Sequence, residues 1–295
     1  MMNAVAIGTE RGLNGRKNGL RDQIASIPRH RGRETSLILP IIREPQAIPV
    51  PGISRRIEVK IASTKSEWEQ AFQLAASNYQ ARGYETPGGN RLRFTPYHAL
   101  PDTLTLIAKH ESQVVATFSI VMDNTLLGLP MEDIYADEIA SLRRRGRRMF
   151  EATTLADTGL KPREFLQVFL TLIKLSMQYH TRNNGDTYVI AVNPRHKKFY
   201  TKIIGFVPLG PLRSYAAVQD APAEAFLLDN QLQRFNSPDT FEFMFGEPLS
   251  ERVLMAPKMP PSLIRQFSRQ SIHCDPEEIE RILAYTDRFG SPKSW

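Results

Sequence analysis

Between residues 57 and 230 the hydrophobic and polar positions follow two periods, one typical of strands and one typical of helices. Residues 57–62 (IEVKIA) alternate between apolar and polar side chains, as a half-buried strand does. From residue 66 to residue 82 the apolar side chains recur at spacings of three and four, which predicts an amphipathic helix that ends at Gly83. By the same criteria we expect further helices at 131–142 and 163–181, and further strands at 103–108, 114–122, 149–155, 188–192, 212–218 and 225–228.

This succession of elements predicts an α/β fold in which a mixed central sheet carries helices on both faces. The apolar run 188–192 is expected at the sheet centre, where both faces of a strand are covered. We divide the chain into a flexible basic arm (1–54), an ordered domain (55–232) and a partly helical C-terminal extension (233–295). Prolines before residue 54 break regular structure at the first boundary, and Asp275 is expected to cap a helix in the extension.

The composition supports one main hydrophobic core and a basic surface. Of the 295 residues 41% are hydrophobic, and the formal net charge of +7 favours an acidic partner such as nucleic acid, anionic lipid or an acidic protein. The single cysteine, Cys274, excludes an internal disulfide and fits a reducing compartment. Because the chain has no apolar run of about 18 residues and no secretory signal pattern, we expect a cytoplasmic protein.

The positive charge is concentrated in two places. One is the N-terminal arm, where arginines outnumber acidic residues and a solvated, flexible segment is the simplest interpretation. The other is a cluster inside the predicted domain, which contains Arg143, Arg144, Arg145, Arg147 and Arg148. This cluster is either a solvated basic face or a docking surface for an acidic partner.

Several common catalytic motifs are missing from the chain. There is no phosphate-binding loop of the G-x-x-x-x-G-K-[ST] type, no strand-linked G-x-G-x-x-G, no H-E-x-x-H and no close cluster of His, Cys and Asp. A G-x-S-x-G nucleophile elbow is also absent, which argues against hydrolase chemistry. We therefore expect neither a metal ion nor a bound cofactor.

The segment NPRHKKFYTKIIGF (193–206) resembles a motif of the GCN5-related acetyltransferase superfamily. That motif runs from a strand through an asparagine to a short helix, which bears a tyrosine and ends in Gly-Phe. Asn193, Tyr200 and Gly205 match it, with one residue more than usual between Tyr200 and Gly205. The resemblance implies that the Tyr200 hydroxyl protonates a departing thiolate. The alternative is that Tyr200 only packs at the start of a helix.

Glu151 is a second candidate, because it is a lone carboxylate in the predicted strand MFEATTLAD. Burying it without a partner would be costly, so it should face a cleft or find a cation. In a cleft, desolvation would raise its pKa towards that of a general base. The alternatives are a surface position on an edge strand or a structural ion pair with Arg147 or Arg148.

Over roughly residues 57–230 the chain is similar to the N-acyl amino acid synthases, which are relatives of the acyl-homoserine lactone synthases. The similarity depends on the spacing of Glu138, Gly146, Glu151 and the NPRH-x-x-FY segment, and we take Glu138, Thr153, Arg147 and His196 as substrate-binding or structural support. In the homoserine lactone relatives a glutamate followed closely by Ser or Thr occupies the matching strand, as Glu151 and Thr153 do. The arginine that follows in those relatives is Leu155 here, so their substrate is not carried over.

The resemblance implies an N-acyltransferase that joins a long-chain acyl group to the α-amine of an amino acid. Glu151 would deprotonate the ammonium through water, backbone N–H groups of Leu155 and Ala156 would hold the carbonyl oxygen, and Tyr200 would protonate the thiolate. Asn193 would lie on the donor side. The acyl chain would lie between splayed strands, near Phe118 and Val192. An arginine should bind the acceptor carboxylate, but the sequence does not indicate which one.

Acyl carrier protein is the donor that the sequence favours. Coenzyme A users of this superfamily carry an R/Q-x-x-G-x-G/A loop whose backbone N–H groups hold the pyrophosphate, whereas this chain has ADTGLKPREFL. The acyl-phosphopantetheine of the carrier would then be the donor substrate, and Arg143, Arg144 and Arg145 would steer the acidic carrier. A lipid-like product would also bring the protein into peripheral contact with a membrane.

Two other functions stay open from the sequence. One is a coenzyme A dependent N-acetyltransferase, and the other is a non-catalytic module that binds acyl groups or nucleic acid. Clustered aromatic residues for base stacking are not evident beside the arginines, so we expect no nucleic-acid partner.

Overall fold

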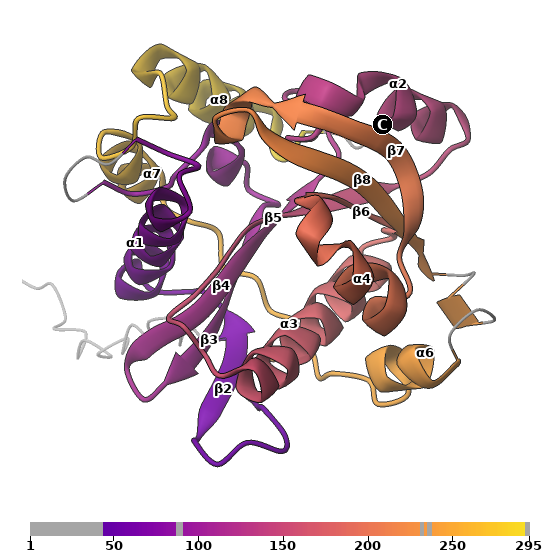
Figure 1. Ribbon diagram of the computed structural model, residues 1–295. Helices are drawn as coiled ribbons and strands as arrows, with labels where there is room; N and C mark the ends of the chain where they lie inside the picture. Colours follow the sequence, from indigo (N-terminus) through magenta and orange to yellow (C-terminus); the bar gives the residue numbers. More distant parts are fainter. Residues whose placement is uncertain (1–43, 87–90, 231–232, 235–237, 293–295) are drawn as a thin grey trace, which may run out of the picture. The chain divides into compact units, whose positions relative to one another are not determined.

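The computed structural model describes residues 44–86, 91–230, 233–234 and 238–292. These residues form an eight-stranded mixed sheet with helices packed against it (Figure 1). The strand order is β1-β2-β3-β4-β5-β6-β8-β7, and every neighbouring pair is antiparallel except β5 and β6, which are parallel. The strands are β1 (Ile48–Pro49), β2 (Ile57–Ile61), β3 (Leu104–His110), β4 (Gln113–Met122), β5 (Met149–Asp157), β6 (Thr187–Val192), β7 (Val207–Tyr215) and β8 (Ala221–Asp229).

Helices cover both faces of this sheet, as the sequence predicted (Figure 1). One face packs against α3 (Pro162–Arg182) and α6 (Pro238–Phe245). The other packs against α1 (Lys65–Ala81), α2 (Glu132–Arg144), α7 (Pro261–Ser268) and α8 (Pro276–Phe289). On β3, Leu106 faces α3 and its neighbour Ile107 faces α1. Successive side chains of a strand point to opposite faces, so a nearly continuous apolar strand indicates a sheet covered on both sides.

Helix boundaries follow local hydrogen bonding. Thr64 caps α1, because its side chain accepts a hydrogen bond from Glu67 N, and Gly83 follows the helix with φ of +70°. Asp275 caps α8 by accepting from Glu277 N, which confirms the predicted start of that helix. No helix in the described part of the chain is long and apolar enough to span a bilayer.

The last two strands lie earlier in the sequence than predicted. The strand expected at 212–218 is β7 (Val207–Tyr215), and its partner β8 begins at Ala221. Pro208 and Pro211 obscure the strand pattern within β7. Proline lacks an N–H for a ladder hydrogen bond, and an edge strand such as β7 tolerates it because one side has no strand partner.

Both predicted domain boundaries fall inside one compact unit, residues 42–295. Ile48 pairs with Val59 of β2, and Val50 is buried in the core, so ordered structure begins before residue 54. The rest of the predicted arm, residues 1–43, lies outside the described residues. At the other end, Phe267 of α7 packs edge-on against Phe72 of α1 with ring centroids 5.6 Å apart. The segment after residue 233 therefore shares the core of the domain.

The parallel pair β5–β6 is joined only over its first residues. Pairing runs from Met149 opposite Thr187 to Glu151 opposite Val189, and the strands then separate. On its other side β5 stays paired with β4 through an irregularity between Thr117 and Ser119. Thr154 lies opposite this irregularity with φ of +55°. A non-glycine residue in the left-handed region marks a bulge that bends the strand away from β6.

Candidate active site

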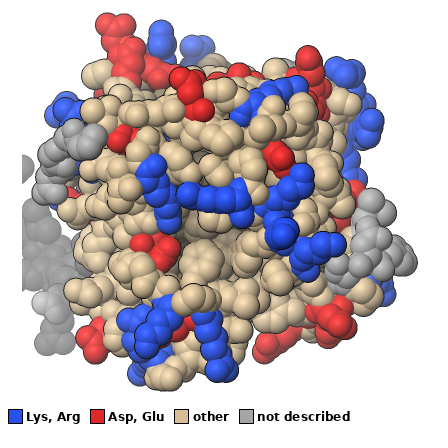
Figure 2. All heavy atoms as spheres, in the orientation of Figure 1, with Lys and Arg blue, Asp and Glu red and all other residues tan. Residues whose placement is uncertain are grey.

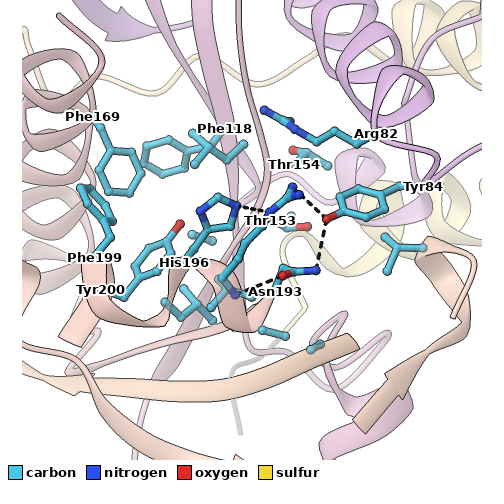
Figure 3. Close-up of a pocket in the computed structure, with 18 of the residues that line it drawn as sticks. Arg82, Tyr84, Phe118, Thr153, Thr154, Phe169, Asn193, His196, Phe199 and Tyr200 are labelled. Atoms are coloured by element: carbon cyan, nitrogen blue, oxygen red, sulfur yellow. Dashed lines mark hydrogen bonds between the residues drawn. The ribbon is translucent and has the colours of Figure 1, made fainter. Parts of the chain in front are cut away.

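A cavity of about 550 Å³ lies where β5 and β6 separate. Its walls come from both strands, the first half of α3, the end of α1, the segment after β6 and the hairpin β7–β8. Pockets for small molecules are typically about 300–1,000 Å³. The figure shows aromatic side chains along one side and polar side chains along the other (Figure 3).

Glu151 lies where the two strands begin to separate, and it is one of the residues that line the cavity. The side chain is buried, with 3% exposed, and its Oε2 accepts a hydrogen bond from Met131 N at 2.9 Å. Burial raises the pKa of Glu151 to about 8, and the carboxylates of Asp133 and Glu132 add to this effect. A carboxyl group with this pKa can exchange a proton near neutral pH.

One peptide group connects Glu151 to Tyr215 at the end of β7. The Tyr215 hydroxyl donates to Pro130 O at 2.8 Å, and the N–H of the same peptide, on Met131, donates to Glu151. Hydrogen bonds in a chain polarise one another, so the Tyr215 hydroxyl strengthens the N–H donor that faces the carboxyl group. Tyr215 therefore holds Glu151 indirectly, and sequence reasoning did not single it out.

Tyr200 starts a π-helical turn, Tyr200–Ile204, directly after the short helix α4 (Lys197–Phe199). Gly205 N donates to Tyr200 O at 3.1 Å, which is the i to i+5 bond of a π-helix. This wider turn accommodates the additional residue between Tyr200 and Gly205. Gly205 ends it with φ of +92°, a conformation that glycine adopts without strain.

The Tyr200 side chain is buried, and its hydroxyl points into the cavity beside His196 (Figure 3). Its ring packs edge-on against Phe169 and Phe206, with centroids 6.0 and 5.8 Å away. Burial raises the pKa of Tyr200 above its usual value, so the phenol keeps its proton at neutral pH. Tyr200 thus packs at the helix start and also presents a proton donor to the cavity.

The apolar wall is long and narrow. On α3 it includes Pro162, Phe165, Phe169 and Ile173, which lie along roughly 16 Å of helix at 1.5 Å per residue. Opposite them lie Phe118, Ile190, Val192 and Phe199. An extended hydrocarbon chain fits such a lining, because every contact it makes there removes apolar surface from water.

Hydrogen bonds tie polar side chains together at the mouth of the cavity (Figure 3). Asn193 Oδ1 accepts from Arg195 N at 3.2 Å, and the Tyr84 hydroxyl accepts from Asn193 Nδ2 and Arg195 Nη2 at 3.5 and 3.2 Å. His196 Nε2 accepts from Arg195 Nε at 2.9 Å. Burial and the neighbouring arginines lower the pKa of His196, so its imidazole is neutral and can accept. Arg82 also lines the mouth and is exposed.

Of the two residues predicted to supply oxyanion donors, Leu155 lines the cavity and Ala156 does not. The N–H and C=O of Asp157 bond to the Asn78 side chain at 3.3 and 2.9 Å, on the side of β5 away from β4. Backbone groups alternate along a strand, so the N–H of Ala156, opposite Thr117, points towards β4. Leu155 lines the cavity, whereas Ala156 is fully buried and does not.

Three other predicted residues lie outside the cavity, in ion pairs. Glu138 accepts from Arg213 Nη1 and Nη2 at 2.9 and 2.7 Å, which joins α2 to β7. Arg147 donates to Thr187 Oγ1 at 2.7 Å and pairs with Asp186 and Asp229. Arg143 pairs with Asp123 and Glu132, and its side chain is only 16% exposed. Among the described residues, Glu151 forms no ion pair with Arg147 or Arg148, the two partners that the sequence left open.

Thr153 lies on β5 in the cavity wall, as predicted for a supporting residue. Arg144 and Arg145 are exposed, but they precede β5, whereas the cavity lies along the later part of that strand. Within the described residues, no group of three or more His, Cys, Asp and Glu side chains could hold a metal ion.

Sequence reasoning missed several cavity residues that come from separate elements: Tyr79 and Arg82 at the end of α1, Tyr84 and Arg93 in the following loop, and Tyr215 on β7. None of the five belongs to a local motif, so only their meeting in space identifies them.

The comparisons with known proteins indicate a family and a fold. A family profile for the N-acyl amino acid synthase FeeM matches residues 70–229, more than half of the chain. The solved structure of FeeM, an N-acyl amino acid synthase from uncultured soil microbes, is 27% identical, with a TM-score of 0.54 over 62% of this chain and 95% of that one.

Two further solved structures are more distant. The AHL synthase LasI is 16% identical, with a TM-score of 0.46 over 70% of this chain and 98% of its own. Agmatine N-acetyltransferase is 14% identical, with a TM-score of 0.41 over 59% of this chain and 99% of its own. None of the curated proteins matches the chain. The sheet that opens after Glu151 has the GCN5-related N-acyltransferase fold, and the chain belongs to the N-acyl amino acid synthase FeeM family of N-acyltransferases.

Proposed function

We propose that this enzyme transfers a long-chain acyl group from the phosphopantetheine of acyl carrier protein to the α-amine of an amino acid. The observation that carries the proposal is one continuous cavity with Glu151 and Tyr200 on its wall and an elongated apolar lining between β5, β6 and α3. The similarity to FeeM, which is described as an N-acyl amino acid synthase, supports the class of product. The product would be an N-acyl amino acid.

In this reaction the amine nitrogen attacks the thioester carbonyl carbon, a C–N bond forms and the C–S bond breaks. Glu151 takes one proton from the acceptor ammonium through water, which frees the lone pair for attack. The Leu155 N–H stabilises the negative charge that develops on the carbonyl oxygen. Tyr200 gives its proton to the leaving thiolate, and a second proton lost by the nitrogen restores the Tyr200 hydroxyl through solvent.

The loop after β5 argues against coenzyme A as the donor. A pyrophosphate would need free backbone N–H groups at the start of α3. The donors of the loop that leads into α3 are already used: Thr158 N bonds to Val115 O, Gly159 N and Leu160 N bond to Asp157 Oδ1 at 2.7 and 2.8 Å, and Lys161 N bonds to Glu164 Oε2 at 3.4 Å. Pro162 has no N–H. Two carboxylates therefore occupy the place of an anion, which disfavours a second anion in the same loop.

The single phosphate of phosphopantetheine has a better site at the cavity mouth. Arg82 and Arg195 line the mouth and are exposed, and neither pairs with a carboxylate in the described part of the chain. Lysines and arginines gather around a hollow in the middle of this face (Figure 2). We therefore place carrier docking here instead of at Arg143, whose charge is neutralised by Asp123 and Glu132.

Glu151→Gln and Tyr200→Phe should each lower kcat by about 10²- to 10⁴-fold, because each removes a proton-transfer group. In the wild type, kcat/KM should rise as the pH increases through about 8, since ionised Glu151 is the active form. Steady-state rates with acyl carrier protein thioesters from pH 6 to 9 measure both effects. Rates of both variants within about twofold of wild type would contradict these roles.

Glu151→Gln should also stabilise the fold, and increasingly so as the pH rises from about 5 to 8. The folded-state pKa of about 8 lies above the ordinary value of 4.5, so the folded protein holds a proton that the unfolded chain releases in this window. Stability that depends on this proton is therefore lost as the pH rises, and the glutamine variant does not lose it. Thermal unfolding of both proteins at several pH values tests this, and a constant difference in Tm would refute the raised pKa.

Reversing the charge of Arg82 and Arg195 should raise KM for an acyl carrier protein thioester at least about tenfold, while kcat changes little. The effect should shrink as salt is added, because exposed charges are screened. The matched control is Arg144→Glu with Arg145→Glu, which removes as much positive charge away from the mouth. A larger effect of the control pair would return docking to the originally predicted cluster.

Ile173→Trp should shift the enzyme towards shorter acyl groups, because Ile173 lines the cavity deep along α3. A larger ring there shortens the space for the end of the chain. Competition between carrier proteins loaded with short and long acyl groups, followed by mass spectrometry of the products, measures the shift. Leu170→Trp on the same helix, which does not line the cavity, serves as the control.

A further inference from the structure

The segment between α7 and α8 lies outside the region that matches the FeeM family, yet it supports one wall of the cavity. The two helices and η1 (Pro96–Ala99) share a hydrophobic cluster with α1. Phe267 at the centre of this cluster is fully buried. The packing brings residues 270–274 beside the loop that carries Arg93.

Hydrogen bonds hold the backbone on both sides of Arg93 to this segment. They run from Leu92 N to Gln270 O (3.0 Å), from Ser271 Oγ to Phe94 O (2.6 Å) and from Cys274 Sγ to Phe94 O (3.4 Å). A guanidinium on a loop can bind a ligand with defined geometry only if its backbone is fixed. The C-terminal segment supplies that fixation.

The Arg93 side chain is buried and lies in the cavity wall. Its guanidinium pairs with Glu85 and lies over the Tyr79 ring, with the guanidinium carbon 3.7 Å from the ring centroid. Arg93 Nε is buried and has no hydrogen-bond partner among the described residues. Buried polar N–H groups are rarely left unpaired, so this one indicates a missing acceptor.

His273 fixes the carboxylate that orients Arg93. Its Nε2 lies 2.7 Å from Glu85 Oε1 and 3.3 Å from Arg93 Nη1. An arginine cannot accept a hydrogen bond, whereas a carboxylate oxygen can, and the contact with Glu85 is the shorter one. Nε2–H of His273 therefore donates to Glu85. Burial and the charge of Arg93 lower the pKa of His273 to about 4, so this donor is a neutral imidazole.

Arg93 and Glu151 both line the cavity and are both buried. Both Glu151 and Arg93 interact electrostatically with Tyr215. The other cavity-lining arginines, Arg82 and Arg195, are exposed at the mouth. Among the described residues that line the cavity, Arg93 is thus the buried cation, and it shares Tyr215 as an electrostatic partner with Glu151.

We propose that Arg93 binds the carboxylate of the acceptor amino acid and that His273, from the C-terminal segment, positions Arg93 through Glu85. This inference rests on the proposed function. A guanidinium presents parallel N–H donors that match the two oxygens of a carboxylate, and Glu85 leaves part of that set unused. The acceptor's α-ammonium then lies towards Glu151. His273 is a positioning residue, because it does not line the cavity.

The test measures the use of two acceptors by the wild-type enzyme and its variants, with an acyl carrier protein thioester as donor. One acceptor is the L-amino acid that gives most product among the twenty, and the other is its carboxamide. Wild type should favour the acid, and Arg93→Gln should raise KM for the acid roughly 10- to 100-fold while KM for the carboxamide and for the donor stays unchanged. His273→Leu should also raise KM for the acid alone, but by less than Arg93→Gln does.

His273→Gln is the matched rescue, because its side-chain amide can still donate to Glu85. It should restore the preference for the acid that His273→Leu loses. An unchanged KM for the donor shows that a variant is folded. If Arg93→Gln does not fold, the comparison of His273→Leu with His273→Gln tests the inference instead. Equal use of acid and carboxamide by wild type, or full preference in His273→Leu, overturns the inference. If wild type acylates no amine at all, the proposed function fails as well.

Discussion

The separation of β5 from β6 after Glu151 is the constraint on which the active site depends. Parallel neighbours normally continue to exchange hydrogen bonds, and here that exchange stops after Glu151 pairs with Val189. The backbone that follows needs other partners, because buried polar groups are costly when unpaired. Asn78 bonds to Asp157, and aromatic residues of α3 fill part of the gap. The space that remains is the cavity.

The same fork determines the chemistry of Glu151. It is the last residue of β5 that is paired on both sides, and its carboxyl group is buried at the closed end of the opening. Among the described residues its hydrogen-bond donor is Met131 N, which belongs to a peptide whose carbonyl accepts from Tyr215. One such bond only partly offsets the cost of burying a charge, which is why the pKa is raised to about 8.

The arginines that line the cavity lie in two chemically different settings, and different parts of the chain build them. Exposed Arg82 and Arg195 meet solvent at the mouth, where water screens their charges and a diffusing partner can reach them. Arg93 is buried beside Tyr79 and Glu85, where a charge is held in one geometry. The packing of α7 and α8 on α1 brings the C-terminal segment to the loop that carries Arg93. A segment that resembles an appendage in the sequence is therefore part of the site's wall.

The sequence by itself determined the order of strands and helices, because hydrophobic period is a local property that each segment carries with it. It also indicated Glu151 and Tyr200 as candidate site residues, because a carboxylate in an apolar strand and a tyrosine in a matching motif can each be recognised from a short stretch of sequence. The one residue that did not fit the motif, before Gly205, is accommodated by a π-helical turn.

Only the tertiary structure decided which charges are available and which residues meet. The arginines from 143 to 148 are alike in sequence, but Arg143 and Arg147 are paired with carboxylates from other segments, whereas Arg144 is exposed. Strand register directs the N–H of Ala156 away from the cavity, although Leu155 beside it lines the wall. Arg93 and His273 are 180 residues apart and touch because two helices pack on a third. Ion pairing, register and long-range packing depend on distances between segments, and no local pattern contains them.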